Sequence, residues 1–354
     1  MAQLFKIKLI MKNVFILIFV FKIGLISSQT ELFKNDPHHV EHIGLKESFF
    51  GDADDYMVCY PKSHRNLFTM IILLGFATSL SIGYALFIQR KSNKKLKNIN
   101  KIIEEKNNDV TASINYSKRI QNAMLPELPL SINTSNSLII YKPKDIVSGD
   151  TYWIDEIENN KFFIIADCTG HGVPGALLTI LVNTAIQKAL FEHKLIVPSL
   201  ILESINNQIK MALKQQSQSG IQDSVDMSVA VINNQTNELK FAGANSNMFL
   251  IINNKIQLVK GSKCTVGSVQ EHVREAPMTS SYVLNKNDSF VLYTDGIVDQ
   301  IGGTDLNKLK RKGFQTIIEE ALLNDFLNSL KSKFDNWVST NEQVDDITSI
   351  TYVV

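Results

Sequence analysis

The chain has 354 residues, 44% of them hydrophobic, and a formal net charge of +1 at pH 7. This length allows one large globular domain with additional segments, and the near-neutral charge argues against an extended nucleic-acid surface. The three cysteines, Cys59, Cys168 and Cys264, stand far apart without a CxxC pair, which argues against a disulfide framework or a zinc ribbon.

The N-terminal segment has the features of a targeting sequence. Lys6, Lys8 and Lys12 precede a fully apolar stretch at 14–21, and small residues follow it. This apolar core is shorter than the ~20 residues that a membrane-spanning helix needs. Residues 1–28 are therefore predicted to form a secretory signal peptide or a short N-terminal anchor.

The segment 67–88 is long enough to cross a bilayer. It contains no charged residue and would be about 33 Å long as a helix. Arg90, Lys91 and further lysines follow it, and by the positive-inside rule they place everything downstream in the cytoplasm. We predict a transmembrane helix at 67–88 in the cytoplasmic (inner) membrane. The protein is then single-pass or two-pass, depending on the fate of residues 1–28.

The segment 29–66 is predicted to be extracytoplasmic. It is too short to form a sensor domain with its own core. It contains His38, His39, Glu41 and His42, which fit either a metal-binding helix face or a solvated polar patch.

The segment 89–126 is predicted to be a cytoplasmic helical linker. Leu96, Ile103 and Val110 stand at seven-residue intervals, whereas Lys106 and Ser113 interrupt the second half of this heptad pattern. Two interpretations remain open: a weak parallel coiled coil that would make a homodimer, or a single amphipathic helix packed on its own domain. The prolines at 126 and 129 end the helix.

Downstream, predicted apolar strands carry acidic residues at their ends. The run 162–165 leads into Asp167, the run 290–293 leads into Asp295, Asp150 follows Gly149, and Asp345 with Asp346 opens the final strand. Asp167 alone would serve equally well as a helix cap. Unpaired carboxylates that meet in space repel one another and resist burial, so a divalent cation would explain them together. Oxygen ligands suit Mg²⁺ or Mn²⁺ rather than zinc.

Four short motifs, in this order, resemble the PPM-type metal-dependent serine/threonine protein phosphatases, specifically their bacterial SpoIIE/RsbU-like branch. The motifs are Ser148-Gly149-Asp150, Asp167-Cys168-Thr169-Gly170-His171-Gly172, Thr294-Asp295-Gly296 and Asp345-Asp346-Ile347-Thr348. The similarity covers about 141–354, and we predict the phosphatase domain at 135–354.

The resemblance implies two divalent cations, Mn²⁺ or Mg²⁺, and a set of site residues. The implied catalytic residues are Asp150, Asp167 and Asp295. The implied metal ligands are Asp150, Asp167, Cys168 through its main-chain carbonyl, Asp226, Asp295 and Asp345. Cys168 stands where the family usually has glycine, and Thr169 stands where eukaryotic relatives have a histidine proposed as general acid.

Two of these positions allow a second interpretation. The alternation around Asp226 puts it on the same strand face as Ser228, so from the residues alone this is a solvated face; only the resemblance makes Asp226 a metal ligand. His171 lies between two glycines and fits either contact with phosphate or a partner, or a simple turn. A redox role for Cys168 lacks a second cysteine nearby.

The catalytic segment alternates strands with a pair of helices at about 174–192 and 198–215. Polar turns predict hairpins of 227–232 with 239–242 and of 249–252 with 256–259, and an amphipathic helix is predicted at 315–337. This order favours an α+β fold of two packed antiparallel sheets flanked by helices. The resemblance implies the four-layer PPM-type sandwich, here preceded by a transmembrane helix and a helical linker.

Three functions compete. The first is a membrane-tethered phosphatase that hydrolyses phosphoserine or phosphothreonine on a cytoplasmic regulatory protein, anti-anti-sigma-like by resemblance, with no nucleic-acid partner. The second is a catalytically degenerate module that only binds a partner, against which stands the presence of aspartate at every expected position. The third is a nucleotide cyclase, which also combines a membrane span, a coiled linker and acidic metal ligands.

Overall fold

The computed structural model describes residues 62–213, 223–268 and 275–354. The predicted signal or anchor segment at 1–28, the four-residue His/Glu cluster near position 40 and almost all of segment 29–66 lie outside the described residues. The chain divides into two compact units, 1–91 and 92–354. Of the first unit, the structure describes only the beginning of helix α2 (Lys62–Met124).

Helix α2 includes the predicted transmembrane segment, and apolar side chains such as Leu73 and Phe76 are exposed there. Among the described residues, two helical stretches, 66–124 and Gly172–Glu192, are long and apolar enough to cross a membrane. The second is mostly buried and is a core helix of the catalytic unit. The exposed apolar segment of α2 is thus a weak indication of membrane association.

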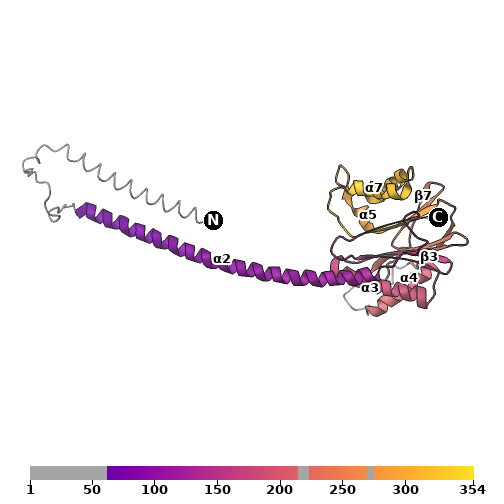
Figure 1. Cartoon of the computed structure of the whole chain (residues 1–354), viewed down its shortest axis with the longest axis horizontal. Coiled ribbons are helices and arrows are strands. Elements are labelled where there is room, and N and C mark those ends of the chain that lie inside the picture. The colour runs from indigo at the N-terminus through magenta and orange to yellow at the C-terminus, as the bar shows by residue number, and fades with distance from the viewer. Residues whose placement is uncertain (1–61, 214–222, 269–274) are drawn as a thin grey trace, which may run out of the picture. The chain divides into compact units, whose positions relative to one another are not determined.

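Two five-stranded antiparallel sheets form the centre of the second unit (Figure 1). One sheet, in spatial order, consists of β1 (Ser137–Lys142), β12 (Ile347–Val353), β9 (Ser289–Tyr293), β6 (Met248–Ile252) and β7 (Lys255–Val259). The other consists of β2 (Asp150–Ile157), β3 (Asn160–Cys168), β4 (Val225–Asn233), β5 (Glu238–Ala244) and β8 (Ser280–Val283).

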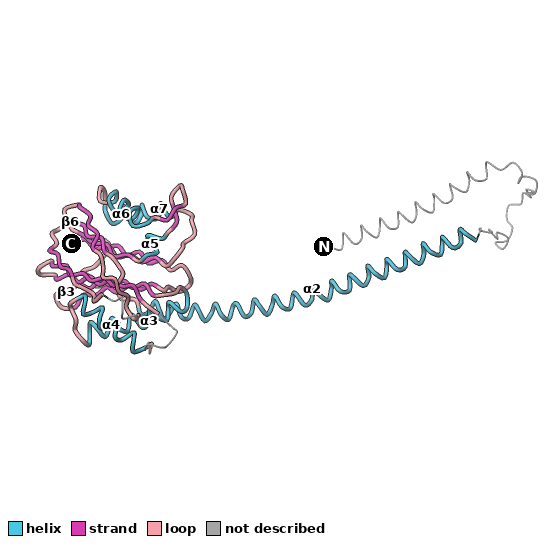
Figure 2. Tube along the Cα trace, turned by 180° about the vertical axis from the view of Figure 1, so that it is seen from behind, coloured by secondary structure: helices cyan, strands magenta, loops and turns pink. Residues whose placement is uncertain are grey.

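Helices cover the outer face of each sheet (Figure 2). The β2–β8 sheet is covered by α3 (Gly172–Gln187), which continues as a π-turn at Lys188–Glu192, and by α4 (Pro198–Ala212). The β1–β7 sheet is covered by α5 (Asp295–Asp299), α6 (Lys310–Ala321) and α7 (Phe326–Val338), with a small hairpin of β10 (Ile301–Gly302) and β11 (Asn307–Lys308) between α5 and α6.

The inner faces of the two sheets pack against each other. Alternation along β3 decides which side chains go there: Phe163 and Ile165 face the other sheet, whereas Phe162 and Ile164 face the helices. The ring of Phe163 contacts those of Phe290 and Tyr352 across the sheets, with centroid distances of 5.2 and 4.8 Å. The predicted four-layer α+β sandwich is therefore confirmed.

The local predictions have mixed outcomes. Both predicted hairpins form, as β4–β5 and β6–β7. The single helix predicted at 315–337 is wrong, because the chain breaks into α6 and α7. The break falls where Asn324 and Asp325 favour a turn, and Asp325 is the extended N-cap residue of α7. The apolar stripe continues across the break, so periodicity alone does not reveal it.

The Phe163 contacts predict a large loss of stability on truncation. Because this ring is fully buried between the sheets, Phe163→Ala should lower the free energy of unfolding by about 3–5 kcal/mol, measured by urea denaturation. Leu323→Ala is the matched control, since that side chain is 81% exposed and should change stability by less than about 0.5 kcal/mol. Equal effects of the two substitutions would contradict this description of the core.

Candidate active site

Three aspartates occupy paired positions on neighbouring strands at one end of the β2–β8 sheet. Asp150 pairs with Asp167 across β2 and β3, and Asp167 pairs with Asp226 across β3 and β4. Directly paired residues point to the same face of a sheet, and the pattern along β3 makes this the inner face. The face that bears Asp226 and Ser228 is therefore not the solvated face that alternation alone suggested, because β4 is a central strand with both faces covered.

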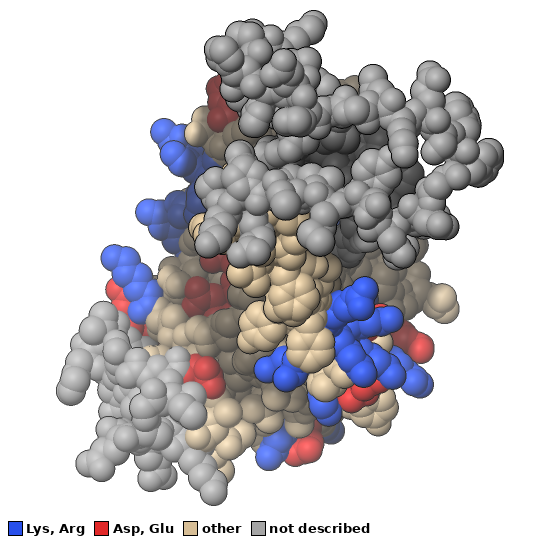
Figure 3. All heavy atoms as spheres, turned by 90° about the vertical axis from the view of Figure 1, so that its left-hand side faces the viewer, with Lys and Arg blue, Asp and Glu red and all other residues tan. Residues whose placement is uncertain are grey.

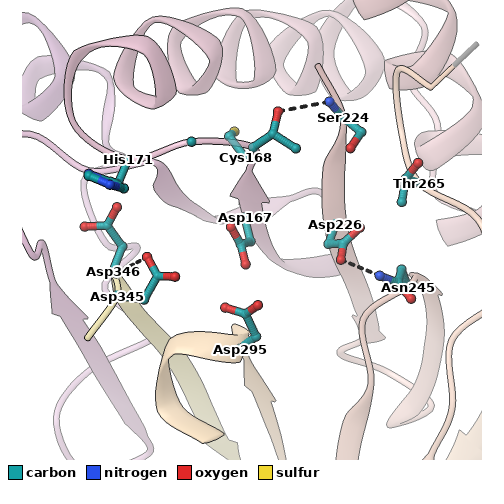
Figure 4. A pocket seen from close by; sticks show the side chains of 12 residues that line it. Asp167, Cys168, His171, Ser224, Asp226, Asn245, Thr265, Asp295, Asp345 and Asp346 are labelled. Atoms are coloured by element: carbon teal, nitrogen blue, oxygen red, sulfur yellow. Dashed lines mark hydrogen bonds between the residues drawn. The ribbon is translucent and has the colours of Figure 1, made fainter. Parts of the chain in front are cut away.

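The other sheet supplies acids from the opposite side. Asp295 is the first residue of α5, directly after β9, and Asp345 and Asp346 directly precede β12. Figure 4 shows Asp167 and Asp295 directed toward each other, whereas the carboxylate of the nearby Asp226 is turned toward Asn245, which donates a hydrogen bond to it. The cleft has a volume of about 440 Å³ and is lined by Asp167, Cys168, Thr169, Gly170, His171, Ser224, Asp226, Asn245, Thr265, Asp295, Asp345 and Asp346. Asp150, 2% exposed, is buried beneath it.

Burial and mutual repulsion raise the pKa values of Asp150, Asp167, Asp226 and Asp295. Desolvation raises the pKa of Asp150 to about 7, with smaller contributions from the charges of Asp346 and Asp295. Desolvation, together with the charges of the neighbouring Asp150 and Asp295, raises the pKa of Asp167 to about 10. The pKa of Asp226 rises to about 6 because burial outweighs its hydrogen bond from Asn245.

No basic side chain compensates these charges directly. Among the ion pairs of the described residues, none involves Asp150, Asp167, Asp226, Asp295, Asp345 or Asp346. The carboxyl groups of Asp167 and Asp295 face each other across the cleft, an arrangement that favours a proton on one of the two when no cation is bound. Uncompensated, partly buried carboxylate oxygens fit a hard divalent cation such as Mg²⁺ or Mn²⁺.

The acids surround the cleft rather than converge on one point. Within the described ranges, no three acidic, histidine or cysteine side chains lie close enough together to form a ready-made metal site. The donor chemistry thus fits a divalent cation, while the final coordination geometry would need side-chain adjustment. The structure brings together all the sequence-predicted site residues, with Asp150 below the cleft floor and the others along its wall.

Asp346 has a positioning role that the sequence did not reveal. Its two carboxylate oxygens accept hydrogen bonds from the main-chain N–H groups of Lys144 and Gly149, both at 2.7 Å. These bonds attach the loop before Asp150 to the start of β12. The adjacent Asp345 instead accepts the N–H of Asp346 at 2.8 Å and lines the cleft.

Thr294 is a second positioning residue outside the sequence-predicted set. Its hydroxyl donates to the carboxylate of Asp150 at 2.8 Å and accepts the N–H of Thr348 at 3.0 Å. It therefore orients Asp150 and joins β9 to β12. The Thr-Asp-Gly and Asp-Ile-Thr motifs were a possible signal, but only their pairing in space explains the hydroxyl.

The side chain and the main chain of Cys168 lie in different surroundings. Its side chain is 4% exposed and packs in the layer between the β2–β8 sheet and the helices. Burial raises the pKa of this thiol well above its usual value, so the reactive thiolate is disfavoured. Only the main-chain side of Cys168 remains available to the cleft, and a redox role gains no support.

His171 and Thr169 have different surroundings. The Thr169 hydroxyl accepts the N–H of Ser224 at 3.1 Å and helps join the ends of β3 and β4. His171 is the N-cap residue of α3, lines the cleft, and its Nδ1 lies 3.0 Å from the carboxylate of Asp145. The contact with Asp145 thus holds His171 at the rim of the cleft through Nδ1.

The end of α2 contacts the segment that carries Asp150. Gln121, 2% exposed, donates to the carbonyl of Ser148 at 2.7 Å and to the hydroxyl of Thr179 in α3 at 2.9 Å. Its side-chain oxygen accepts the Ser148 N–H at 3.1 Å. A single linker side chain therefore touches both a core helix and the residue two positions before Asp150.

Two antiparallel sheets covered by helices, with an acidic cleft at one end of the sandwich, define a PP2C-type protein phosphatase domain. The model of the SpoIIE family (stage II sporulation protein E) matches residues 158–353, more than half of the chain. The chain belongs to the SpoIIE family and carries a protein phosphatase domain. Phosphatases of this class depend on divalent metal ions.

Solved structures agree with this assignment. The SiaA-PP2C domain of Pseudomonas aeruginosa is 25% identical, with a TM-score of 0.62; the match covers 70% of this chain and 98% of that domain. The RsbU and RsbW domains of Rv1364c from Mycobacterium tuberculosis are 18% identical, with a TM-score of 0.51 and coverage of 65% and 61%.

The PP2C phosphatase domain of SpoIIE from Bacillus subtilis, solved with a fragment of its regulatory domain, is 17% identical, with a TM-score of 0.51 and coverage of 62% and 63%. These last two similarities concern the fold alone. None of the proteins with a curated function matched the sequence.

The raised pKa values predict how the metal-free protein responds to pH. The unfolded chain releases the protons of Asp150, Asp167 and Asp226 near their ordinary value of 3.8, whereas the native state keeps them up to about pH 7, 10 and 6. Because the native state binds more protons in this interval, its stability falls as pH rises from about 4 upward.

Asp167→Asn removes the largest of these shifts. In EDTA, its melting temperature should fall less steeply than that of the wild type between pH 5 and pH 9, and the variant should be the more stable protein at pH 9. The melting temperatures of both proteins are measured by thermal unfolding in matched buffers. If they change with pH in parallel, Asp167 is not protonated in the metal-free native state.

Proposed function

We propose that this protein is a membrane-tethered, metal-dependent serine/threonine phosphatase that hydrolyses phosphoserine or phosphothreonine on a cytoplasmic regulatory protein. The observation that carries the proposal is the group of uncompensated carboxylates that both sheets direct to one open cleft. Such a group is costly to maintain unless cations bind there. The cleft is also shallow enough for a phosphorylated loop of a folded protein.

The proposed ligands are Asp150, Asp167, Asp226, Asp295 and Asp345, together with the main-chain carbonyl of Cys168. Two divalent cations, Mn²⁺ or Mg²⁺, would supply Lewis acidity toward the phosphoryl oxygens and lower the pKa of a nucleophilic water.

The chain's own residues orient the reaction. Asp167 and Asp295 face each other from the two sheets and fix the two sides of the cleft. Thr294 and Asp346 hold Asp150 and its loop in place. His171 lines the cleft, and Asp145 fixes the orientation of its ring through Nδ1. We assign it contact with the departing serine or threonine oxygen.

Substitution of the central acids tests the ligand set. Asp167→Asn or Asp295→Asn should abolish Mn²⁺-dependent hydrolysis of p-nitrophenyl phosphate by the full-length protein while leaving its far-UV circular dichroism unchanged. Asp305→Asn, at an exposed turn, is the control and should keep full activity. If a variant retains more than about a tenth of wild-type turnover, the barrier has changed by less than about 1.4 kcal/mol. The substituted aspartate is then not a metal ligand.

The same assay addresses the alternatives raised by the sequence. A degenerate binding module would show no Mn²⁺-dependent turnover in the wild type. A nucleotide cyclase belongs to a different class of protein from the SpoIIE-family phosphatase domain that this chain carries.

The proposed substrate is a folded phosphoprotein. Specificity toward a protein should come from docking contacts outside the small acidic cleft, so the folded partner supplies binding energy that a short peptide lacks. The kcat/KM for an intact phosphorylated regulator should exceed that for its isolated phosphopeptide by at least about tenfold, equivalent to about 1.4 kcal/mol. Equal values would remove the protein-substrate assignment while leaving phosphatase activity in place.

We further propose that the linker controls the site. Gln121 at the end of α2 pairs with both main-chain groups of Ser148, and unpairing such buried groups costs about 1–3 kcal/mol. The exposed apolar residues of the heptad register, such as Ile99 and Ile103, would be covered by a second copy in a homodimer.

Replacing residues 91–120 with a strong dimeric coiled coil, in two registers, should change turnover or Mn²⁺ affinity in at least one register. Gln121→Leu should weaken Mn²⁺ affinity by about tenfold or more, whereas Gln257→Leu on an exposed part of β7 should not. Unchanged turnover and affinity in both fusions and in Gln121→Leu would show that the linker is only a tether.

A further inference from the structure

A compact basic segment lies on the elements that follow Asp295, one of the residues that line the cleft. In residues 308–312, four of the five side chains are basic: Lys308, Lys310, Arg311 and Lys312. All four are exposed. We call these four side chains the basic ledge. On the face drawn in Figure 3, both basic and acidic side chains are exposed among the described residues. In the ledge itself, four cations lie within five positions with no acid between them.

The backbone that carries the basic ledge is anchored to the core. Leu309, within the run, is 4% exposed and packs in the core under α6, and its N–H donates to the carbonyl of Gln300 at 2.9 Å. The preceding hairpin is held by α7, because the N–H of Gly303 donates to the carbonyl of Trp337 at 3.0 Å. At Gly302 a Cβ would lie 2.2 Å from that carbonyl, so only glycine fits there. The basic side chains therefore project from anchored backbone.

Lys308 connects the ledge electrostatically to the cleft. Lys308 binds Asp299 at 2.9 Å, and its charge also acts on Asp295, the cleft residue at the start of the same short helix. Among the described ion pairs, none involves Lys310, Arg311 or Lys312. The charges of Lys310 and Lys312 are therefore available to a partner, whereas that of Arg311 acts on Tyr293.

We propose that the basic ledge docks an acidic stretch of the substrate protein next to its phosphorylated residue. The inference rests on the proposed phosphatase function and names the substrate class for the same cleft. A phosphorylated segment is itself anionic and meets carboxylates at the cleft. Opposite charges within about one Debye length, ~10 Å at 0.1 M salt, offset that repulsion and raise the association rate. Substrates with acidic flanks are therefore selected over neutral or basic ones.

Two phosphoserine peptides that differ only in their flanks, glutamate in one and glutamine in the other, test this with the full-length protein and Mn²⁺. The wild type should hydrolyse the glutamate peptide with a kcat/KM about fivefold or more higher at low salt, and the preference should shrink as salt rises. Lys310→Glu with Lys312→Glu should abolish or reverse the preference. Arg311 is left unchanged because its charge acts on the buried Tyr293.

Lys255→Glu with Lys286→Glu is the matched control. These lysines are exposed and lie at the end of β9 opposite Asp295, so this variant should keep the wild-type preference. Turnover of p-nitrophenyl phosphate should be the same in all three proteins. Peptide binding, measured by fluorescence anisotropy without turnover, tests the ledge separately from catalysis.

The outcomes are distinguishable. If the wild type hydrolyses p-nitrophenyl phosphate but treats both peptides alike in turnover and in binding, the ledge proposal is wrong and the phosphatase function stands. If no phosphate ester is hydrolysed, the proposed function fails, and the anisotropy measurement still decides whether acidic peptides bind at the ledge. Equal loss of preference in both double variants would show a general charge effect and would also overturn the proposal.

Discussion

Repulsion among carboxylates that are partly removed from water is the constraint on which the catalytic unit depends. Asp150, Asp167 and Asp226 occupy paired positions on three neighbouring strands, and Asp295 approaches them from the end of β9 in the other sheet. Unpaired buried charge costs several kcal/mol, so these side chains must either hold protons or share cations. The surrounding structure keeps them together despite that cost, because strand register fixes three of them and hydrogen bonds fix their neighbours.

The support around the site consists largely of close main-chain contacts. A Cβ at Gly149 would lie 2.5 Å from the carbonyl oxygen of Gly170, and one at Gly175 would lie 2.1 Å from the same atom. The loop before Asp150, the turn after Asp167 and the first turn of α3 therefore touch without intervening side chains. Together with the two hydrogen bonds to Asp346, these contacts leave the site loop little room to move independently of α3 and β12.

The sequence predicted the architecture and most of the acidic cluster, because both depend on local patterns. Apolar strands that end in aspartate are visible in the chain, and antiparallel pairing brings such ends together. Asp226 shows the limit of this reasoning: alternation placed it with Ser228, but whether that face was solvated depended on a second sheet that strand patterning cannot position. The break between α6 and α7 was missed because the apolar stripe continues through it.

The supporting residues were beyond sequence reasoning for a similar reason. Thr294, Asp346 and Gln121 act through partners 27 to 202 positions away in the chain, and nothing in their neighbourhood indicates those partners. An aspartate beside a predicted ligand is indistinguishable from the ligand until its hydrogen bonds are known. Periodicity predicts which side chains are buried, whereas the identity of a polar contact requires the full topology.

The position of β12 in its sheet has a consequence for how the protein is made. This strand lies between β1 and β9, and among the described strands it is the only neighbour of β1 in the sheet, although almost the whole domain separates the two strands in the chain. During synthesis, β1 must wait for β12 before it can pair, and such long-range pairing is slow. Because Asp345 and Asp346 arrive with β12, the acidic cleft is completed in the same step that closes the sheet. A nascent chain therefore acquires the site only when the sandwich itself is finished, and no partly folded form carries the complete cleft.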